Sequence, residues 1–305
     1  MKPGLSVIVP ALLGYDTVLA ALDAWETQSC RDRLEIIVLC PTEETGRSLP
    51  AGQFVIATGA MDLHEARAAA IRKANADHVV LAEDHCLPDR LWAQAILRRL
   101  AEGGEAIGPA LRSGNPKTTL AQASFLLGYG QWMMPVKGGQ VEALPGHNVV
   151  LPKSTLLAMG PALEHDLLVA AFLLQRLHRQ GMSFYLEENA TMRHFDIYSW
   201  KRCLQIFGAI GLGFGAIRTQ NWPLAGRGLY WLATPVVAAK HWARALANYR
   251  RAGAAGGLGL MSVVVALLLA TAWAFGEAVG ALMGVHRVTP FVSFSEIKPV
   301  ARCDV

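Results

Sequence analysis

The chain has 305 residues, of which 52% are hydrophobic and 17% are charged, and its formal net charge is +4. This composition is more apolar than that of an average soluble protein and indicates that part of the chain lies in a membrane. The small charge, without an arginine-rich arm, gives no sign of a nucleic-acid partner. Five scattered cysteines without a CxxC pair argue against a disulfide framework or a structural zinc site, and they indicate a reducing compartment.

Short apolar runs alternate with helical patterns over the first third of the chain. The predicted strands are residues 5–9, 34–39, 53–57 and 78–82. The predicted helices are residues 15–28, 62–74 and 89–101. This rhythm is typical of a parallel sheet covered by helices. Asp62 and Glu65 predict a capping box at the start of the second helix. At the N-terminus, Pro10 interrupts the apolar run, so a buried first strand is a better interpretation than a signal peptide.

Polar side chains gather where the fourth predicted strand ends, at Glu83, Asp84 and His85. In parallel sheets, ligands bind beyond the carboxyl ends of the strands. Pro10 and Cys40 end the first two strands and fall at the same edge. We therefore expect the functional site there; the alternative is a solvated turn with an incidental histidine.

The pattern weakens after this region and then returns. Residues 110–144 are rich in glycine, proline and polar residues and are predicted to be irregular. Residues 146–160 predict a strand that leads into a short helix, and residues 164–179 predict a longer helix that stops before Gly181. Two further strands are predicted at 182–186 and 191–194.

The last third is predicted to be associated with a membrane. A helix over residues 258–284 would be about 40 Å long, against about 30 Å for the hydrocarbon core of a bilayer. We predict a transmembrane segment at 258–285, and the alternative is a buried helix of a soluble domain. The flank before it is basic and aromatic and places that side in the cytoplasm by the positive-inside rule; its basic residues are Lys240, Arg244, Arg250 and Arg251.

The order and spacing of several motifs resemble the family-2 glycosyltransferases of GT-A fold. The motifs are Leu5-Ser-Val-Ile-Val-Pro10, Leu34-Glu-Ile-Ile-Val38, Ala66-Arg67 and Val79-Val-Leu-Ala-Glu-Asp-His-Cys-Leu-Pro88. The resemblance continues to about His194 and so covers roughly two thirds of the chain. It implies an α/β domain over residues 1–200, with a mostly parallel sheet flanked by helices. A membrane-associated helical region would follow at 201–305.

The resemblance implies a divalent metal at the turn after the fourth strand, where the family has a carboxylate triplet. Glu83 and His85 occupy that place as the expected inner ligands, and His194 lies where the family often has a histidine near the metal or diphosphate. Asp84 is expected to bind the ribose or to order the turn. The metal would be Mn²⁺ or Mg²⁺, and the imidazole shifts the preference toward manganese or a later metal.

The resemblance also implies contacts to a nucleotide-sugar donor. Pro10 and Ala11 fall where the family's first loop lies along the base, and Arg67 falls where a helix arginine can reach the phosphates. The alternative for Arg67 is a surface arginine near Glu65. Cys40 stands where the family usually has an aspartate that contacts the base. Base recognition is then left to Glu35, Thr42 or Glu43.

An inverting transfer needs a carboxylate that accepts the proton of the acceptor hydroxyl. The family's usual spacing would place an acidic pair at Val169 and Ala170, which are apolar here. The nearest carboxylates are Glu164, which we prefer as the base, and Asp166. The alternative is that both residues merely cap a helix.

The implied function is an inverting glycosyltransferase at the cytoplasmic face of a membrane. It would move a sugar from a nucleotide-diphosphate sugar to a lipid-linked or polysaccharide acceptor. Two alternatives stay open: a metal-dependent hydrolase of a nucleotide-sugar or diphosphate, and a non-catalytic membrane-anchored protein that binds a nucleotide-sugar. Donor turnover separates the three.

Overall fold

The computed structural model describes residues 2–44, 47–196 and 199–295. Backbone contacts divide the chain into two compact units. Unit 1 is built from Met1–Arg112 and Val136–Arg193, and unit 2 is built from Ser113–Pro135 and His194–Glu296. Two of the boundaries between them, at Ser113 and at His194, fall at the last residue of a strand. A domain division at about residue 200 stays a prediction.

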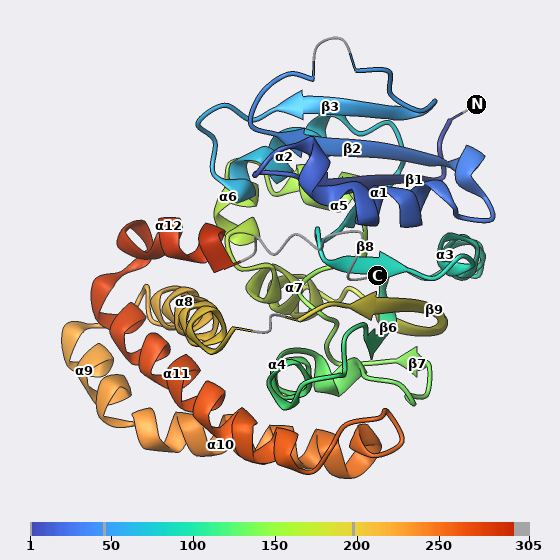
Figure 1. Cartoon of the computed structure of the whole chain (residues 1–305). Coiled ribbons are helices and arrows are strands. Elements are labelled where there is room, and N and C mark those ends of the chain that lie inside the picture. The colour runs from blue at the N-terminus through green and yellow to red at the C-terminus, as the bar shows by residue number, and fades with distance from the viewer. Residues whose placement is uncertain (1, 45–46, 197–198, 296–305) are drawn as a thin grey trace. The chain divides into compact units, whose positions relative to one another are not determined.

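A mixed sheet forms the centre of unit 1 (Figure 1). Its first four strands pair in parallel in the order β3-β2-β1-β4: β1 (Leu5–Pro10), β2 (Leu34–Cys40), β3 (Gln53–Ala57) and β4 (His78–Leu81). The order continues through β8 (Val150–Pro152), β6 (Ala106–Ser113), β9 (Phe184–His194) and β5 (Cys86–Pro88), while β7 (Gly139–Gln140) pairs with β9. The pairs β4–β8, β6–β8 and β7–β9 are antiparallel.

The apolar strands form the core because both faces of the sheet are covered. Every residue of β1 and β2 is buried, as expected for strands without a solvated face. Helix α2 packs on β1 and β2 and opens with the predicted capping box between Asp62 and Glu65. The helices of this unit are η1 (Tyr15–Val18), α1 (Leu19–Glu26), η2 (Arg31–Arg33), α2 (Leu63–Lys73), α3 (Trp92–Ala101), α5 (Lys153–Ala158), α6 (Ala162–Leu167) and α7 (Ala170–Arg179). The predicted α/β class is confirmed.

Three expectations for the chain after residue 110 were wrong. The segment predicted to be irregular contains the end of β6 and helix α4 (Thr119–Tyr129), which Thr118 caps by accepting from the Ala121 amide at 3.1 Å. The long helix predicted at 164–179 is two helices, because the backbone at Val169 is extended. The two strands predicted at 182–186 and 191–194 are the single strand β9.

Unit 2 is helical in its described residues. Its elements are α4, η3 (Gly130–Trp132), α8 (Trp200–Arg218), α9 (Leu224–Leu232), α10 (Thr234–Asn248), the π-helical turn η4 (Tyr249–Gly253), α11 (Met261–Met283) and α12 (Val285–Ser295). Helix α11 packs against α8, α10, α4 and α9 (Figure 1). Among the described residues, α11 is the helix long and apolar enough to cross a membrane, but 56% of its most apolar window is buried inside the unit.

Glycines allow α8 and α11 to touch backbone to backbone. A Cβ atom on Gly215 would lie 1.9 Å from the Glu277 carbonyl oxygen, and one on Gly280 would lie 2.1 Å from the Leu212 carbonyl oxygen. Small residues spaced four apart serve this close packing in membranes and elsewhere. Glu277 itself is fully buried, and its carboxylate accepts from Arg218 at 2.8 Å, from His241 at 2.9 Å and from Tyr230. This one carboxylate therefore ties α11 to α8, α9 and α10.

Candidate functional site

The turn between β4 and β5 is an ordered, buried structure. Glu83, Asp84 and His85 expose at most 4% of their surface. Asn148 holds the turn: its Oδ1 accepts from the Glu83 amide at 3.2 Å, and its Nδ2 donates to Glu83 Oε2 at 2.7 Å. Asn148 has φ of 60°, a left-handed conformation that asparagine tolerates better than most residues. The backbone is thus bent to present this amide to Glu83.

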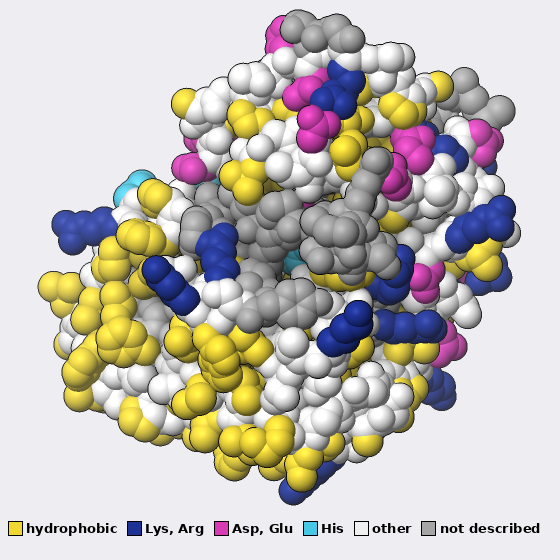
Figure 2. All heavy atoms as spheres, viewed as in Figure 1, with side chains coloured by type: hydrophobic (Ala, Val, Ile, Leu, Met, Phe, Trp, Pro, Cys, Tyr) yellow, Lys and Arg dark blue, Asp and Glu magenta, His cyan; other side chains and the backbone are white. Residues whose placement is uncertain are grey.

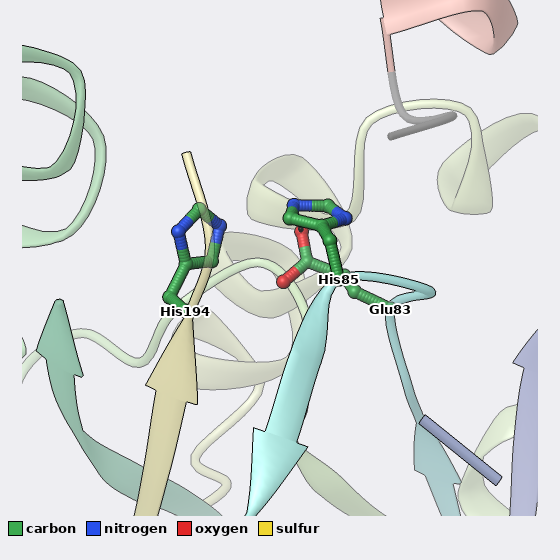
Figure 3. Close-up of side chains that lie close together, drawn as sticks. All are labelled: Glu83, His85 and His194. Atoms are coloured by element: carbon green, nitrogen blue, oxygen red, sulfur yellow. Dashed lines mark ion pairs between the residues drawn. The ribbon is translucent and has the colours of Figure 1, made fainter. Parts of the chain in front are cut away.

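The predicted metal ligands Glu83, His85 and His194 lie together (Figure 3). Each offers one ligand atom, these atoms lie within 4.8 Å of one another, and all three residues are buried. His85 Nε2 is 3.6 Å from Glu83 Oε1. His194 is the last residue of β9. The structure therefore brings together side chains that are more than one hundred positions apart, and their role as ligands stays a prediction.

Each of the two imidazoles has a carboxylate within hydrogen-bond distance of its Nδ1. Asp84 Oδ1 lies 2.5 Å from His85 Nδ1, and Asp196 Oδ2 lies 2.9 Å from His194 Nδ1. A carboxylate can only accept, so each Nδ1 carries the proton and Nε2 is the nitrogen that can ligate. This carboxylate–histidine arrangement fixes ring orientation and raises ligand basicity in metal sites. This contact is compatible with the ordering role that was one of the two alternatives for Asp84, and both alternatives stay predictions.

Asp196 is itself held by a network within unit 2. Its amide donates to Asn115 Oδ1 at 2.8 Å, and its Oδ1 accepts from the Ser124 hydroxyl. The Tyr129 ring packs on the His194 ring, with centroids 4.1 Å apart. Sequence reasoning missed these residues because it took their segment to be irregular. The Thr118 cap and the apolar run after it are the local signal that locates their helix.

The donor set fits a divalent cation. One carboxylate and two neutral imidazoles suit Mn²⁺, Fe²⁺ or Zn²⁺ better than Mg²⁺, which prefers oxygen ligands. Burial of all three groups is compatible with the binding of an ion, because their ligand atoms lie within 4.8 Å of one another and a cation among them would compensate for the lost hydration. Glu83, His85 and His194 are the residues that would hold the ion.

Three of the predicted donor-binding residues lie near this turn or at the same sheet edge. Pro10 ends β1, and the Ala11 amide donates to the Leu39 carbonyl at 2.8 Å at the carboxyl ends of β1 and β2. Arg67 is 1% exposed, so it is not a surface arginine. Its guanidinium lies 3.5 Å from the carbonyl of Ala82, the residue before Glu83. Arg67 therefore lies next to the turn between β4 and β5.

Glu35 lies at the amino end of β2, whereas Cys40 lies at its carboxyl end, and the contact of Glu35 with a nucleotide base stays a prediction. It is the second residue of β2, five positions before Cys40, or about 16 Å at the rise of a strand. Its carboxylate accepts from the Asn75 amide at 2.8 Å and from the Ser6 hydroxyl. Glu35 therefore connects β2 with β1 and with the segment after α2 at the amino edge of the sheet.

Cys40 ends β2 at the edge where the site lies, but it is a poor nucleophile. Its side chain is fully buried, and burial, aided by the nearby Glu44 carboxylate, raises the pKa of the thiol to about 11. The thiolate, which is the reactive form, is then scarce at neutral pH.

The two predicted catalytic carboxylates lie in α6, each in an ion pair. Glu164 Oε1 is 2.5 Å from Arg72 Nη2, in the last turn of α2, and Asp166 Oδ2 is 2.6 Å from Arg176 Nη1. Partial burial opposes ionisation of Glu164, but the Arg72 hydrogen bond prevails and lowers the pKa of its carboxyl, which weakens it as a proton acceptor. Val169, at the family's usual position, is apolar and buried. Glu164 and Asp166 stay predictions.

No protein-family model matches the sequence, and no curated protein matches it. Its fold is similar to that of several solved glycosyltransferases. A mannosyltransferase from Pyrobaculum calidifontis, in complex with GDP-Man and Mn²⁺, shares 16% identity over 93% of this chain and 75% of its own, with a TM-score of 0.49. GalNAc-T7 with UDP, GalNAc and Mn²⁺ shares 12% identity over 64% of this chain, with a TM-score of 0.46.

Staphylococcus aureus TarS, residues 1–349, in complex with UDP-GlcNAc, shares 12% identity over 65% of this chain and 60% of its own, with a TM-score of 0.40. The chain spans 44% of the GalNAc-T7 chain that it matches. These likenesses concern the fold alone.

Proposed function

We propose that the chain is a metal-dependent glycosyltransferase that takes a sugar from a nucleotide-diphosphate sugar. The observation that carries the proposal is the buried group Glu83, His85 and His194, which begins at the carboxyl end of a parallel strand. Nucleotide phosphates bind at this edge in open α/β sheets. When bound, a divalent cation there would neutralise the charge that grows on a departing nucleoside diphosphate.

The chain's own residues have separable tasks in this proposal. Asn148 holds Glu83, and Asp84 and Asp196 hold the two imidazoles in the tautomer that ligates through Nε2. Preorganised ligands of this kind need no rearrangement when charge develops. Pro10 and Ala11 are proposed to border the nucleotide, and Arg67 to support the turn that faces its phosphates.

The test is binding of a panel of nucleotide-sugars to the purified chain, followed by thermal unfolding with Mn²⁺ and with chelator. We expect one donor to raise the unfolding temperature in Mn²⁺ only. His85→Ala and Glu83→Ala should remove this shift. Equal donor binding in excess chelator would contradict the proposal.

Turnover then separates the alternatives. Sugar transfer to an acceptor supports the transferase, and release of the free sugar without acceptor supports a hydrolase. Binding without either reaction supports a non-catalytic protein, a reading that the apolar Val169 and Ala170 keep open. Lipid-linked and polysaccharide acceptors are tested in the same assay, and the anomeric configuration of the product tests inversion.

The catalytic base has its own test. A loss of about 10²- to 10⁴-fold in transfer rate for Glu164→Gln, at unchanged donor affinity, assigns the base to Glu164. The same result for Asp166→Asn assigns it to Asp166. Wild-type rates in both folded variants place the base elsewhere in the chain.

We also propose that the chain works at the cytoplasmic face of a membrane, where a lipid-linked acceptor would be within reach. The apolar helix α11 and the basic residues before it support this location. Fractionation of the intact chain with membranes is the expected result, and full solubility without detergent would reject it.

A further inference from the structure

Helix α9 exposes the side chains that a helix normally buries. Leu224–Leu232 contains no buried residue. Leu224, Leu229 and Leu232 are 79%, 69% and 66% exposed. The inward side of the helix is occupied by Tyr230, which donates to the buried Glu277. The helix is therefore anchored to unit 2 on one side and turns leucines outward on the other.

The exposed apolar side chains continue onto the neighbouring helices of unit 2. Figure 2 shows hydrophobic side chains gathered at its lower left, over the region where Figure 1 places α9, α10 and α11. We call the large exposed hydrophobic residues of α9, α10 and α11 the apolar face; they are Leu224, Leu229, Trp231, Leu232, Val236, Trp242, Met261, Val264, Leu267, Leu268, Phe275 and Leu282. Contiguous apolar surface of this kind marks an interaction site.

Among the described residues of unit 2, the exposed charged side chains are all cationic. Among its described residues the only carboxylates are Asp196 and Glu277, and both are buried. Its cationic side chains are Lys117, Lys201, Arg202, Arg218, Arg227, Lys240, Arg244, Arg250, Arg251 and Arg287. In Figure 2 the Asp and Glu side chains of the visible face lie in its upper and right-hand parts. Unit 2 therefore presents apolar and cationic groups with no exposed carboxylate among the described residues.

We infer that the apolar face binds the surface of an anionic lipid bilayer, with α9 seated at the boundary between headgroups and acyl chains. An interfacial helix buries its apolar side chains there while nearby Lys and Arg side chains meet anionic headgroups. Trp231 and Trp242 suit this depth because tryptophan is enriched at membrane interfaces. A soluble protein partner would not require the uniform positive charge.

This inference deepens the membrane location proposed above by naming the lipid and the surface. It does not require α11 to cross the bilayer. More than half of the most apolar window of α11 is used inside unit 2, so its hydrophobicity is partly satisfied by α4, α8 and α10. The outward stripe of α11 then extends the surface that α9 begins.

The experiment is flotation of the purified full chain with vesicles of phosphatidylcholine alone and with about 30% phosphatidylglycerol. We expect stronger binding to the anionic vesicles, and weaker binding at about 0.5 M than at about 0.1 M NaCl. The double change Leu229→Gln with Leu232→Gln should reduce binding by about tenfold or more. Both leucines are exposed, so the fold should be retained, and circular dichroism checks this.

Matched variants separate the apolar and cationic contributions. Leu91→Gln replaces a leucine of unit 1 that is 57% exposed and should leave binding unchanged. Lys240→Gln with Arg250→Gln should weaken binding to anionic vesicles by about tenfold and leave binding to neutral ones unchanged. Wild-type binding by the α9 variant, equal binding to both vesicles, or no vesicle binding would each overturn the inference. Donor and metal binding are measured without vesicles, so failure of the proposed function is seen separately.

Discussion

At the scale of single residues, the candidate site depends on side chains that form hydrogen bonds with the predicted ligands and orient them. Asp196 is 3% exposed at its side chain and positions His194 through Nδ1. Its own partners, Asn115 and Ser124, come from a distant segment. Such outer residues control how well a site holds its ion.

Asp196→Asn should therefore weaken Mn²⁺ binding by about 10- to 100-fold, because a neutral amide no longer raises the basicity of His194. Electron paramagnetic resonance of free Mn²⁺ gives the affinity directly. Glu35→Gln is the matched control: it alters another buried carboxylate, at the amino edge of the sheet, and should leave the affinity unchanged. An unchanged affinity in Asp196→Asn would show that Asp196 has no positioning role.

Cys40 should behave as a buried thiol without a catalytic task. With a pKa raised to about 11, its thiolate fraction at pH 8 is about 0.1%, against about 24% for an ordinary thiol of pKa 8.5. We expect iodoacetamide to label Cys40 only after unfolding, as measured by mass spectrometry. Cys40→Ser should retain transfer activity. Rapid labelling of the native chain at pH 8 would contradict this account.

At the scale of elements, the contact between α8 and α11 depends on glycine. Gly215→Ala should destabilise the fold by about 1–3 kcal/mol or more, because its Cβ would overlap the Glu277 carbonyl oxygen. Gly208→Ala, in the same helix, has nothing within 4 Å of the added atom and should stabilise by up to about 1 kcal/mol. Urea unfolding in detergent measures both. Equal stability of the two variants would mean that α8 and α11 do not pack in this way.

At the scale of the whole molecule, metal binding should be linked to folding. Mn²⁺ at about one hundred times its dissociation constant should raise the free energy of unfolding by about 2.7 kcal/mol if the unfolded chain does not bind it. Calorimetry with and without Mn²⁺ measures this change. Glu83→Ala should abolish it, since that residue supplies the carboxylate of the group. A stabilisation of the same size in Glu83→Ala would place the metal at another site.

The sequence alone was sufficient for the four parallel strands β1 to β4 and for the polar turn that follows β4. The strands β1 and β2 were predictable because a run of apolar residues buried on both faces needs no knowledge of its partners. The capping box of α2 was predictable because its two residues, Asp62 and Glu65, are only three positions apart. Glu83 and His85 follow directly on β4, so local order placed them at the carboxyl edge of the sheet.

Only the tertiary structure decided what surrounds those residues. Asn148 reaches Glu83 across 65 positions and Asn115 reaches Asp196 across 81, and neither pairing leaves a periodic pattern in the sequence. The pairing of Glu35 with Asn75, 40 positions apart, likewise forms only when distant segments meet. Local hydrophobic patterns determine which segments form strands and helices, whereas the contacts that orient a buried polar group form only after distant segments meet.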